Sequence, residues 1–192
     1  MPGWLTDGVP QLTQTTGSET FNCDTNGANG TSPQMGAVSL QQLANLLSFY
    51  ENGLSKTMVA GSIYYSSINI GFPATLTGLG VRLGTTGGTD NWAVALYGPT
   101  GTLLANSNLS GTLAGTASTW QQIPFTATYN LLVPGNYFVA LQSNGTTATF
   151  DAMNAVTSPI FTGSKTGAFG TFTSITPPTT YTANLGPRML AY

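Results

Sequence analysis

The fold is decided by the stretch Asn91-Trp92-Ala93-Val94-Ala95-Leu96-Tyr97, an apolar run that ends at the turn-forming residues Gly98-Pro99-Thr100-Gly101. A return run begins at residues 102–105, and a second apolar run, residues 136–142, follows a turn at residues 132–135. Both apolar runs are short, rich in β-branched and aromatic residues, and bounded by Gly, Pro and Asn, which is typical of buried strands. They predict the two central strands of a β-sandwich.

Two further strands are predicted before this pair, at residues 63–70 and 74–83. The second alternates between apolar and polar residues, and its change of phase near Gly78 predicts a β-bulge. Its predicted core residues are Leu76, Leu79, Val81 and Leu83.

Three predictions concern the later part of the chain. Residues 120–125 are expected to form an edge strand, because Pro124 cannot donate to a ladder. Residues 146–150 are expected to pair across Asn144-Gly145 with the 136–142 run, and residues 151–170 to form a long loop.

About eight short strands with turns near every ten residues predict an all-β domain, a β-sandwich of jelly-roll or Greek-key type, over residues 58–192. The strand order is not predicted. The expected aromatic core is Trp92, Tyr97, Phe125, Tyr137, Phe138 and Phe150, since large aromatics dominate sandwich interiors.

The first 57 residues predict an extended arm followed by one short α-helix. Gly and Pro interrupt residues 1–38 too often for any long element, so we expect contact with a neighbouring chain to order the arm. Ser39 and Gln42 form a capping box at the start of the helix. The expected contact residues of the arm and helix are Phe21, Leu40, Leu43 and Leu47.

Composition excludes several classes of function. Charged residues make up only 5% of the 192 residues and the net charge is −2, so nucleic-acid binding and polybasic membrane targeting lack their basic footprint. No apolar run is long enough to span a bilayer, and no signal peptide is visible. With a single cysteine there is no disulfide framework, and we expect a protein made in a cytoplasm.

Catalysis and metal binding are also not expected. Histidine is absent, which removes the commonest general base and metal ligand, and Cys23 has no histidine to activate it. Asp90 and Asp151 both flank predicted strands and could meet as a glycosidase pair or around Ca²⁺, but turn formation explains each of them more simply. We therefore expect no catalytic residues, no cofactor and no metal.

Trp120 is the one aromatic residue singled out for possible binding. It follows the Gly-, Thr- and Ser-rich loop at residues 111–119, where side chains tend to be exposed. An exposed indole ring is a candidate stacking surface for a sugar.

The stretch TGSETFNCDT at residues 16–25, with TSPQ at 31–34 and SLQQLA at 39–44, resembles a segment of tailed-bacteriophage virion proteins. Cys23 stands where an apolar residue would be expected in that family. The resemblance implies a jelly-roll module of the kind used as capsid decoration proteins, head fibres and tail-fibre tips. It implies a structural role, so no functional residues are carried over.

The expected function is therefore a non-enzymatic capsid decoration (cement) protein on the capsid exterior of a virion, made in the host bacterial cytoplasm. Residues 1–57 would bind the major capsid protein or sister copies, with a homotrimer as the expected assembly. The alternative is a glycan- or receptor-binding module of a tail fibre or spike, with Trp120 as the contact. A glycan-cleaving enzyme that uses Asp90 and Asp151 ranks third.

Overall fold

The computed structural model describes residues 53–154 and 160–192, which are called the β-domain below. All regular structure in the β-domain is β-strand, and every pair of neighbouring strands is antiparallel. The all-β prediction is confirmed. The predicted helix and the contact residues Phe21, Leu40, Leu43 and Leu47 lie outside the described residues.

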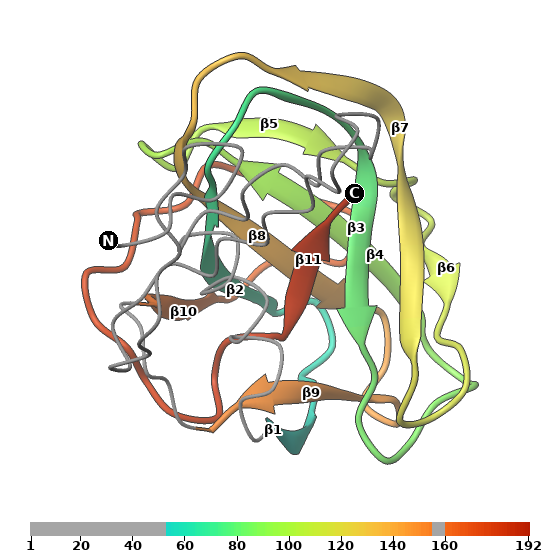
Figure 1. Cartoon of the computed structure of the whole chain (residues 1–192). Helices are drawn as coiled ribbons and strands as arrows, with labels where there is room; N and C mark the ends of the chain where they lie inside the picture. The colour runs from blue at the N-terminus through green and yellow to red at the C-terminus, as the bar shows by residue number, and fades with distance from the viewer. Residues whose placement is uncertain (1–52, 155–159) are drawn as a thin grey trace, which may run out of the picture. The chain divides into compact units, whose positions relative to one another are not determined.

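The strands form three sheets (Figure 1). The six-stranded sheet has the order β10-β2-β8-β4-β5, with β6 also paired to β4, and its strands are β2 (Ile63–Ile70), β4 (Asn91–Tyr97), β5 (Leu103–Asn106), β6 (Thr112–Leu113), β8 (Gly135–Ser143) and β10 (Thr162–Lys165). The three-stranded sheet has the order β11-β3-β7, with β3 (Ala74–Arg82), β7 (Trp120–Leu131) and β11 (Met189–Ala191). A two-stranded sheet pairs β1 (Gly53–Thr57) with β9 (Thr149–Met153).

The two predicted central strands are confirmed as neighbours, because β4 pairs with β8 from Trp92↔Ser143 to Tyr97↔Phe138. The bulge in β3 is confirmed by a shift of register between Leu76 and Gly78. β7 is an edge strand, as Pro124 predicted, although it extends to Leu131.

The predicted pairing of residues 146–150 with the 136–142 run is wrong. Residues 149–153 instead form β9, which pairs with β1 in a separate sheet. The carboxylate of Asp90 accepts the backbone N–H groups of Thr147 and Ala148, which turns the chain away from β8 before a hairpin can form. The predicted loop at residues 151–170 is also wrong in part, because it contains the end of β9 and all of β10.

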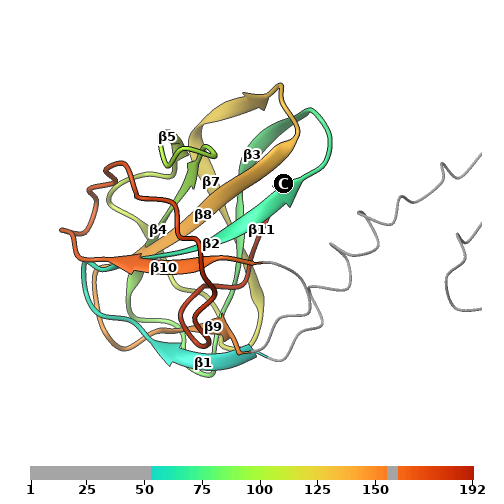
Figure 2. The same cartoon turned by 90° about the vertical axis from the view of Figure 1, so that its left-hand side faces the viewer.

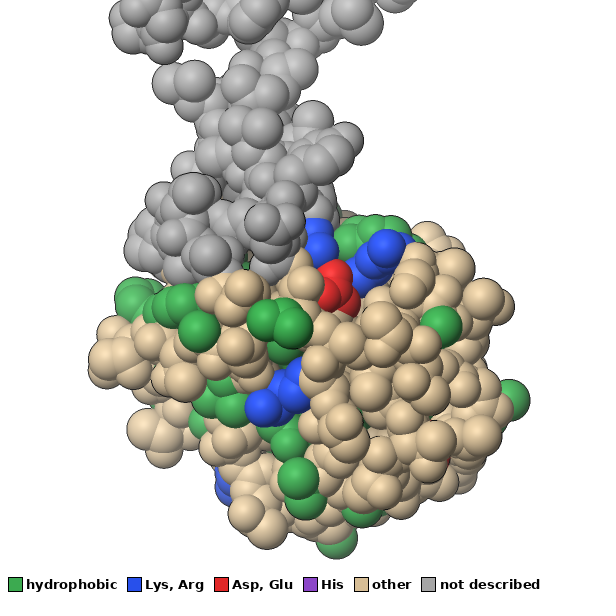
Figure 3. Space-filling view, turned by 90° about the horizontal axis from the view of Figure 1, so that it is seen from below, with side chains coloured by type: hydrophobic (Ala, Val, Ile, Leu, Met, Phe, Trp, Pro, Cys, Tyr) green, Lys and Arg blue, Asp and Glu red, His purple; other side chains and the backbone are tan. Residues whose placement is uncertain are grey.

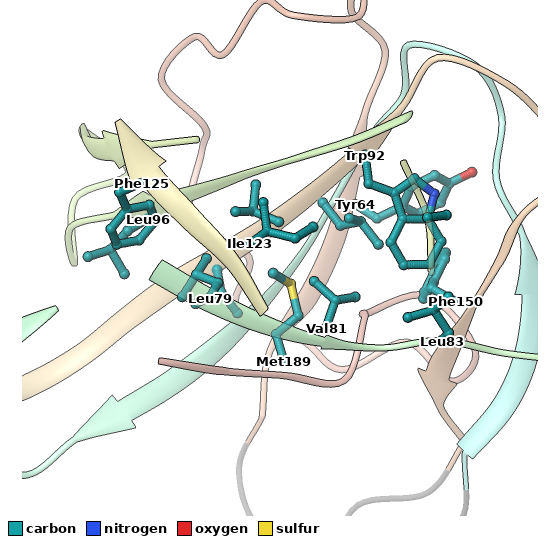
Figure 4. Close-up of a cluster of buried hydrophobic side chains, with 14 of the residues drawn as sticks. Tyr64, Leu79, Val81, Leu83, Trp92, Leu96, Ile123, Phe125, Phe150 and Met189 are labelled. Atoms are coloured by element: carbon teal, nitrogen blue, oxygen red, sulfur yellow. The ribbon is translucent and has the colours of Figure 1, made fainter. Parts of the chain in front are cut away.

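The main core lies where the three-stranded sheet packs on the six-stranded sheet (Figure 4). Alternate residues of β4 and β8 point into it, among them Trp92, Val94 and Leu141, and so does Ile123 of β7. The predicted core residues of β3 and all six predicted core aromatics are confirmed as buried. Phe150, from β9, packs against the ring of Tyr64 with a centroid distance of 5.3 Å.

The other face of the six-stranded sheet is buried as well. Its apolar side chains come from the intervening positions of the same strands and include Tyr65, Tyr97 and Phe138. Residues 166–180, called the covering segment below, contain no strand and contribute Ile175 and Phe172 to this second core. Burial on both faces explains why the central strands are nearly continuous apolar runs instead of alternating ones.

Gly101 shows how closely the covering segment approaches the sheet. The N–H of Ile175 donates to the carbonyl of Gly101 at 3.0 Å, and a Cβ on Gly101 would lie 1.9 Å from the carbonyl oxygen of Ile175. Gly101 also has a φ of 82°, which only glycine adopts without strain. The turn between β4 and β5 therefore requires glycine for two reasons.

Candidate functional site

Asp90 is used by the fold itself. Its side chain is buried, and its Oδ2 accepts the N–H groups of Thr147 at 2.7 Å and Ala148 at 2.6 Å. A buried carboxylate with two backbone donors anchors the loop that follows β8.

Asp151 has a separate partner. Its Oδ2 accepts a hydrogen bond from Nη1 of Arg188 at 2.7 Å, and both side chains are 13% exposed. The backbone reinforces the pair, since the N–H of Arg188 donates to the carbonyl of Asp151. Each of the two acids thus has a structural role, and within residues 53–154 and 160–192 no group of three or more His, Cys, Asp or Glu side chains could hold a metal ion.

Trp120 lies at the start of β7 with 39% of its surface exposed. Ile123 and Phe125 of the same strand point into the core, so Trp120 and Gln122 lie on the opposite, outer face of the three-stranded sheet. Arg82 of β3 is the cross-strand neighbour of Trp120. An aromatic ring beside a guanidinium and an amide offers both a stacking surface and hydrogen-bond donors to a polar ligand.

The loop before Trp120 is held in place by Gln121. Its Nε2 donates to the carbonyl of Leu113 at 2.8 Å, and its Oε1 accepts the N–H of Gly115 at 2.9 Å. These two bonds tie Gln121, at the end of the loop, to residues near its beginning, and so they fix the backbone next to Trp120.

Five of the six charged residues of the β-domain lie at one end of it, and the sixth, Lys165, begins there but reaches to the covering segment. The strand registers place Ile63, Arg82 and Trp120 at this end, and Ile70, Ala74 and Leu131 at the other. The charged residues of the β-domain are Lys56, Arg82, Asp90, Asp151, Lys165 and Arg188.

Contacts with neighbouring residues place these charges. The backbone of Lys165 pairs with Ile63, while its Nζ donates to Thr173 Oγ1 at 2.7 Å and to the carbonyl of Ser174 at 3.0 Å in the covering segment. Lys56 lies over the ring of Tyr64 at 5.8 Å. The carbonyl of Arg188, the partner of Asp151, accepts the N–H of Arg82. We call this the charged end; Figure 3 views it directly and shows Lys and Arg side chains at several places on this face, some of them beside an acidic side chain, with hydrophobic side chains among them.

The opposite end carries exposed apolar side chains. The turn between β2 and β3 holds Phe72, and the turn between β7 and β8 holds Leu132 and Val133. The two turns lie side by side, away from β1 and β9 (Figures 1 and 2). We call residues 71–73 and 132–134 the apolar end.

The apolar end was not predicted from the sequence, because the residues of both turns indicated only breaks between strands. The sequence feature that could have indicated this surface is the presence of large apolar residues, Phe72, Leu132 and Val133, inside turns that contain Gly and Pro. Their proximity depends on the registers Ile70↔Gly135 and Ala74↔Leu131, which sequence patterns do not supply.

Comparison of the chain with protein-family models, with curated proteins and with solved structures finds no match. A search of the described residues for a helix long and apolar enough to cross a membrane finds none.

Proposed function

We propose that this chain is a non-enzymatic structural protein of a tailed-bacteriophage virion, and specifically a capsid decoration protein. In this proposal the β-domain is a β-sandwich of jelly-roll type displayed on the capsid exterior. Residues 1–57 bind the major capsid protein, and sister copies associate as a homotrimer.

The observation that carries the proposal is the separation of two different surfaces at opposite ends of the β-domain. β1, where the described chain begins at Gly53, pairs with β9 beside the charged end. The two most exposed large apolar side chains, Leu132 and Val133, lie at the other end. A module with one end next to its connecting segment and a distinct surface at the far end suits a protein that is attached at one side and makes contacts at the other.

Two further features support the proposal. The resemblance of residues 16–44 to phage virion proteins points to the same class of protein. The charged content of 5% leaves surfaces that rely on Thr, Ser, Asn and Gly, and such surfaces pack against neighbours without the cost of desolvating ions.

The test is a binding assay with purified particles that lack the protein. The full chain should co-sediment with the particles, and a chain that begins at Ser39 should not, while circular dichroism and thermal unfolding show that the shortened protein retains a folded β-domain. If the shortened protein still decorates the particles, residues 1–38 are not the anchor and this part of the proposal fails.

The second candidate is a glycan- or receptor-binding module of a tail fibre or spike, and it is favoured by Trp120. The ring lies on an outer sheet face beside Arg82 and Gln122, on a backbone fixed by Gln121. On a glycan array, Trp120→Ala should abolish the signal, and Leu113→Ala, at a second exposed apolar position nearby, should leave it unchanged. A decoration protein without this activity gives no signal for the unmodified chain.

A further inference from the structure

The outer face of the three-stranded sheet carries a set of side chains that share one surface (Figure 1). Gly80 lies between Leu190 of β11 and Gln122 of β7, and Arg82 lies opposite Trp120. The residues that alternate with these along the strands point into the main core, on the other side of the sheet. We call this outer surface the sheet platform; its members are Arg82, Trp120, Gln122, Leu190 and Tyr192.

Two glycines in β3 allow side chains from the C-terminal strand to lie across it. A Cβ on Gly80 would be 2.9 Å from Cγ of Leu190, and a Cβ on Gly78 would collide with the hydroxyl group of Tyr192. Both glycines are buried, and Leu190 and Tyr192 are half-buried. The middle strand therefore adds no side chain of its own at these two positions, and the platform is flat there.

The backbone under the platform is fixed on both sides of β3. The N–H groups of Thr77 and Gly78 donate to the backbone oxygen of Tyr192 at 2.7 Å and 3.3 Å, and the N–H of Tyr192 donates to the carbonyl of Gly78 at 3.2 Å. The two side-chain bonds of Gln121 fix the backbone next to Trp120. A preformed surface of this kind loses little conformational entropy when it binds.

The guanidinium of Arg82 has no acidic partner among residues 53–154 and 160–192. The two acids in this part of the chain are already bound, since Asp90 accepts two backbone N–H groups and Asp151 is paired with Arg188. Arg82 is only half-buried. A guanidinium has a planar set of donors that fits a carboxylate with two parallel hydrogen bonds. Arg82 thus offers an uncompensated charge to a ligand beside the exposed ring of Trp120.

From this geometry we propose that the sheet platform binds a polysaccharide that carries carboxylate groups, such as a polymer of uronic acids. The indole of Trp120 lies against a sugar ring, Arg82 pairs with the carboxylate, and the amide of Gln122 bonds to hydroxyl groups. The inference rests on the second candidate function, glycan binding, and names its class of ligand.

The platform is longer than a single sugar ring. Tyr192 lies over Gly78, which is four residues from Arg82 along β3, or roughly 13 Å at the rise of a β-strand. An extended chain that begins at Trp120 can therefore cross Leu190 and reach Tyr192.

The charges of the platform also argue against other anionic partners. Nucleic acids and heavily sulfated polymers need many cations in a row, whereas the neighbours of Arg82 on the platform are uncharged. The described part of a second copy of this chain has no unpaired carboxylate to offer, because Asp90 and Asp151 are both bound. A neutral glycan would leave the charge of Arg82 without a partner. A polymer with widely spaced carboxylates fits best.

The first experiment is calorimetric titration of the full chain with oligomers of alginate, hyaluronate, polygalacturonate and polysialate, each compared with its own methyl ester. Esterification keeps the sugar rings and removes the charge. At least one acidic form should bind, and its ester should bind about tenfold more weakly. Equal binding of acid and ester would overturn the inference but leave glycan binding standing. If neither these polymers nor the neutral glycans of an array bind, the inference and the second candidate function both fail.

The second experiment compares variants on the acidic oligomer that binds. Arg82→Gln should lower its affinity about tenfold and leave the affinity for the ester unchanged, whereas Trp120→Ala should lower both. Lys56→Gln is the matched control, because it removes one positive charge from the same end of the β-domain. Thermal unfolding checks that each variant is folded. If Lys56→Gln weakens binding as much as Arg82→Gln, the attraction is not specific to the platform and the inference is wrong.

Tyr192→Ala tests the far side of the platform. It should weaken the binding of long oligomers by about threefold to tenfold and leave the binding of a single uronate unit unchanged. Unchanged binding of the long oligomers would contradict a ligand that extends across β3.

Discussion

Replacement of Gln142 tests how the covering segment is held on the sheet. Gln142 lies in β8 and is fully buried. Its Nε2 donates to the carbonyls of Gly61 at 2.7 Å and Ala168 at 2.8 Å, and its Oε1 accepts the N–H of Gly170 at 3.0 Å. One side chain therefore connects the central strand to the turn before β2 and to the covering segment.

The expected magnitude follows from these three bonds. Gln142→Leu keeps a similar volume but leaves three backbone groups without their partner, at about 1–3 kcal/mol for each buried group that stays unsatisfied. Part of this cost is regained when the covering segment shifts and admits water, so we expect a loss of about 3–5 kcal/mol in the free energy of unfolding. Such a loss is a large fraction of the 5–15 kcal/mol typical of native domains.

The assay is urea unfolding followed by tryptophan fluorescence, since Trp92 is fully buried in the main core. Gln122→Leu is the matched control, because the same change is made at an exposed position of β7, and we expect it to alter stability by less than about 0.5 kcal/mol. A loss below about 1 kcal/mol for Gln142→Leu would show that these hydrogen bonds do not hold the covering segment.

Gln142→Glu adds a pH test at the same position. A glutamate there would face two carbonyl oxygens in a buried site, so the fold should favour the protonated form and raise the pKa of the carboxyl above its unfolded value of about 4.3. The variant should then be most stable below that pH and lose stability as the pH rises through the raised pKa. Equal destabilisation at pH 4 and pH 7 would contradict the buried position of this side chain.

Three further predictions concern other buried groups. Asp90→Ala should lower stability by about 2–4 kcal/mol in urea unfolding, because the N–H groups of Thr147 and Ala148 lose their acceptor; a change within about 0.5 kcal/mol would contradict the anchor. Tyr97→Phe should change stability little at pH 7, because its buried hydroxyl has no hydrogen-bond partner among the described residues. Burial, with a smaller contribution from Tyr65, raises the pKa of Tyr97. The unmodified protein should therefore lose stability above about pH 10, and the Phe variant should lose less. An equal loss of stability in the two proteins above that pH would contradict this prediction. Gly101→Ala should cost about 1–3 kcal/mol, since it combines a positive φ with a close backbone contact, and a neutral result in thermal unfolding would show that the turn can relax.

The sequence predicted correctly those strands that show a clear apolar run bounded by turn residues or a clear alternation of apolar and polar residues. Residues 91–97 and 136–142 are apolar, β-prone and bounded by turn residues, and the structure places them side by side as parts of β4 and β8. The phase change in β3 was visible because its large apolar residues move from an even position, Leu76, to odd positions, Leu79 and Val81.

The failed predictions share a physical cause, which is that long-range contacts overrode local signals. Asn144-Gly145 is a good hairpin turn by composition, but Asp90 holds the two N–H groups that follow it, and β9 pairs with β1 almost a hundred residues earlier in the chain. The covering segment has no periodic pattern, so nothing in its sequence indicated that it buries a second sheet face.

One candidate site was visible in the sequence, and the other required the structure. Trp120 was singled out from its loop context, and the structure places it on an exposed face, while its function as a glycan contact stays a prediction. The apolar end required the registers of two strand pairs before Phe72 and Leu132 could be placed together.

The most direct test of the proposed role is electron cryomicroscopy of purified virions from cells that produce this protein. We predict density for the β-domain on the capsid exterior, with the end formed by β1 and β9 next to the shell. Virions without such density, together with full-length protein found only free in the lysate, would contradict the claim that this chain is a structural component of the particle.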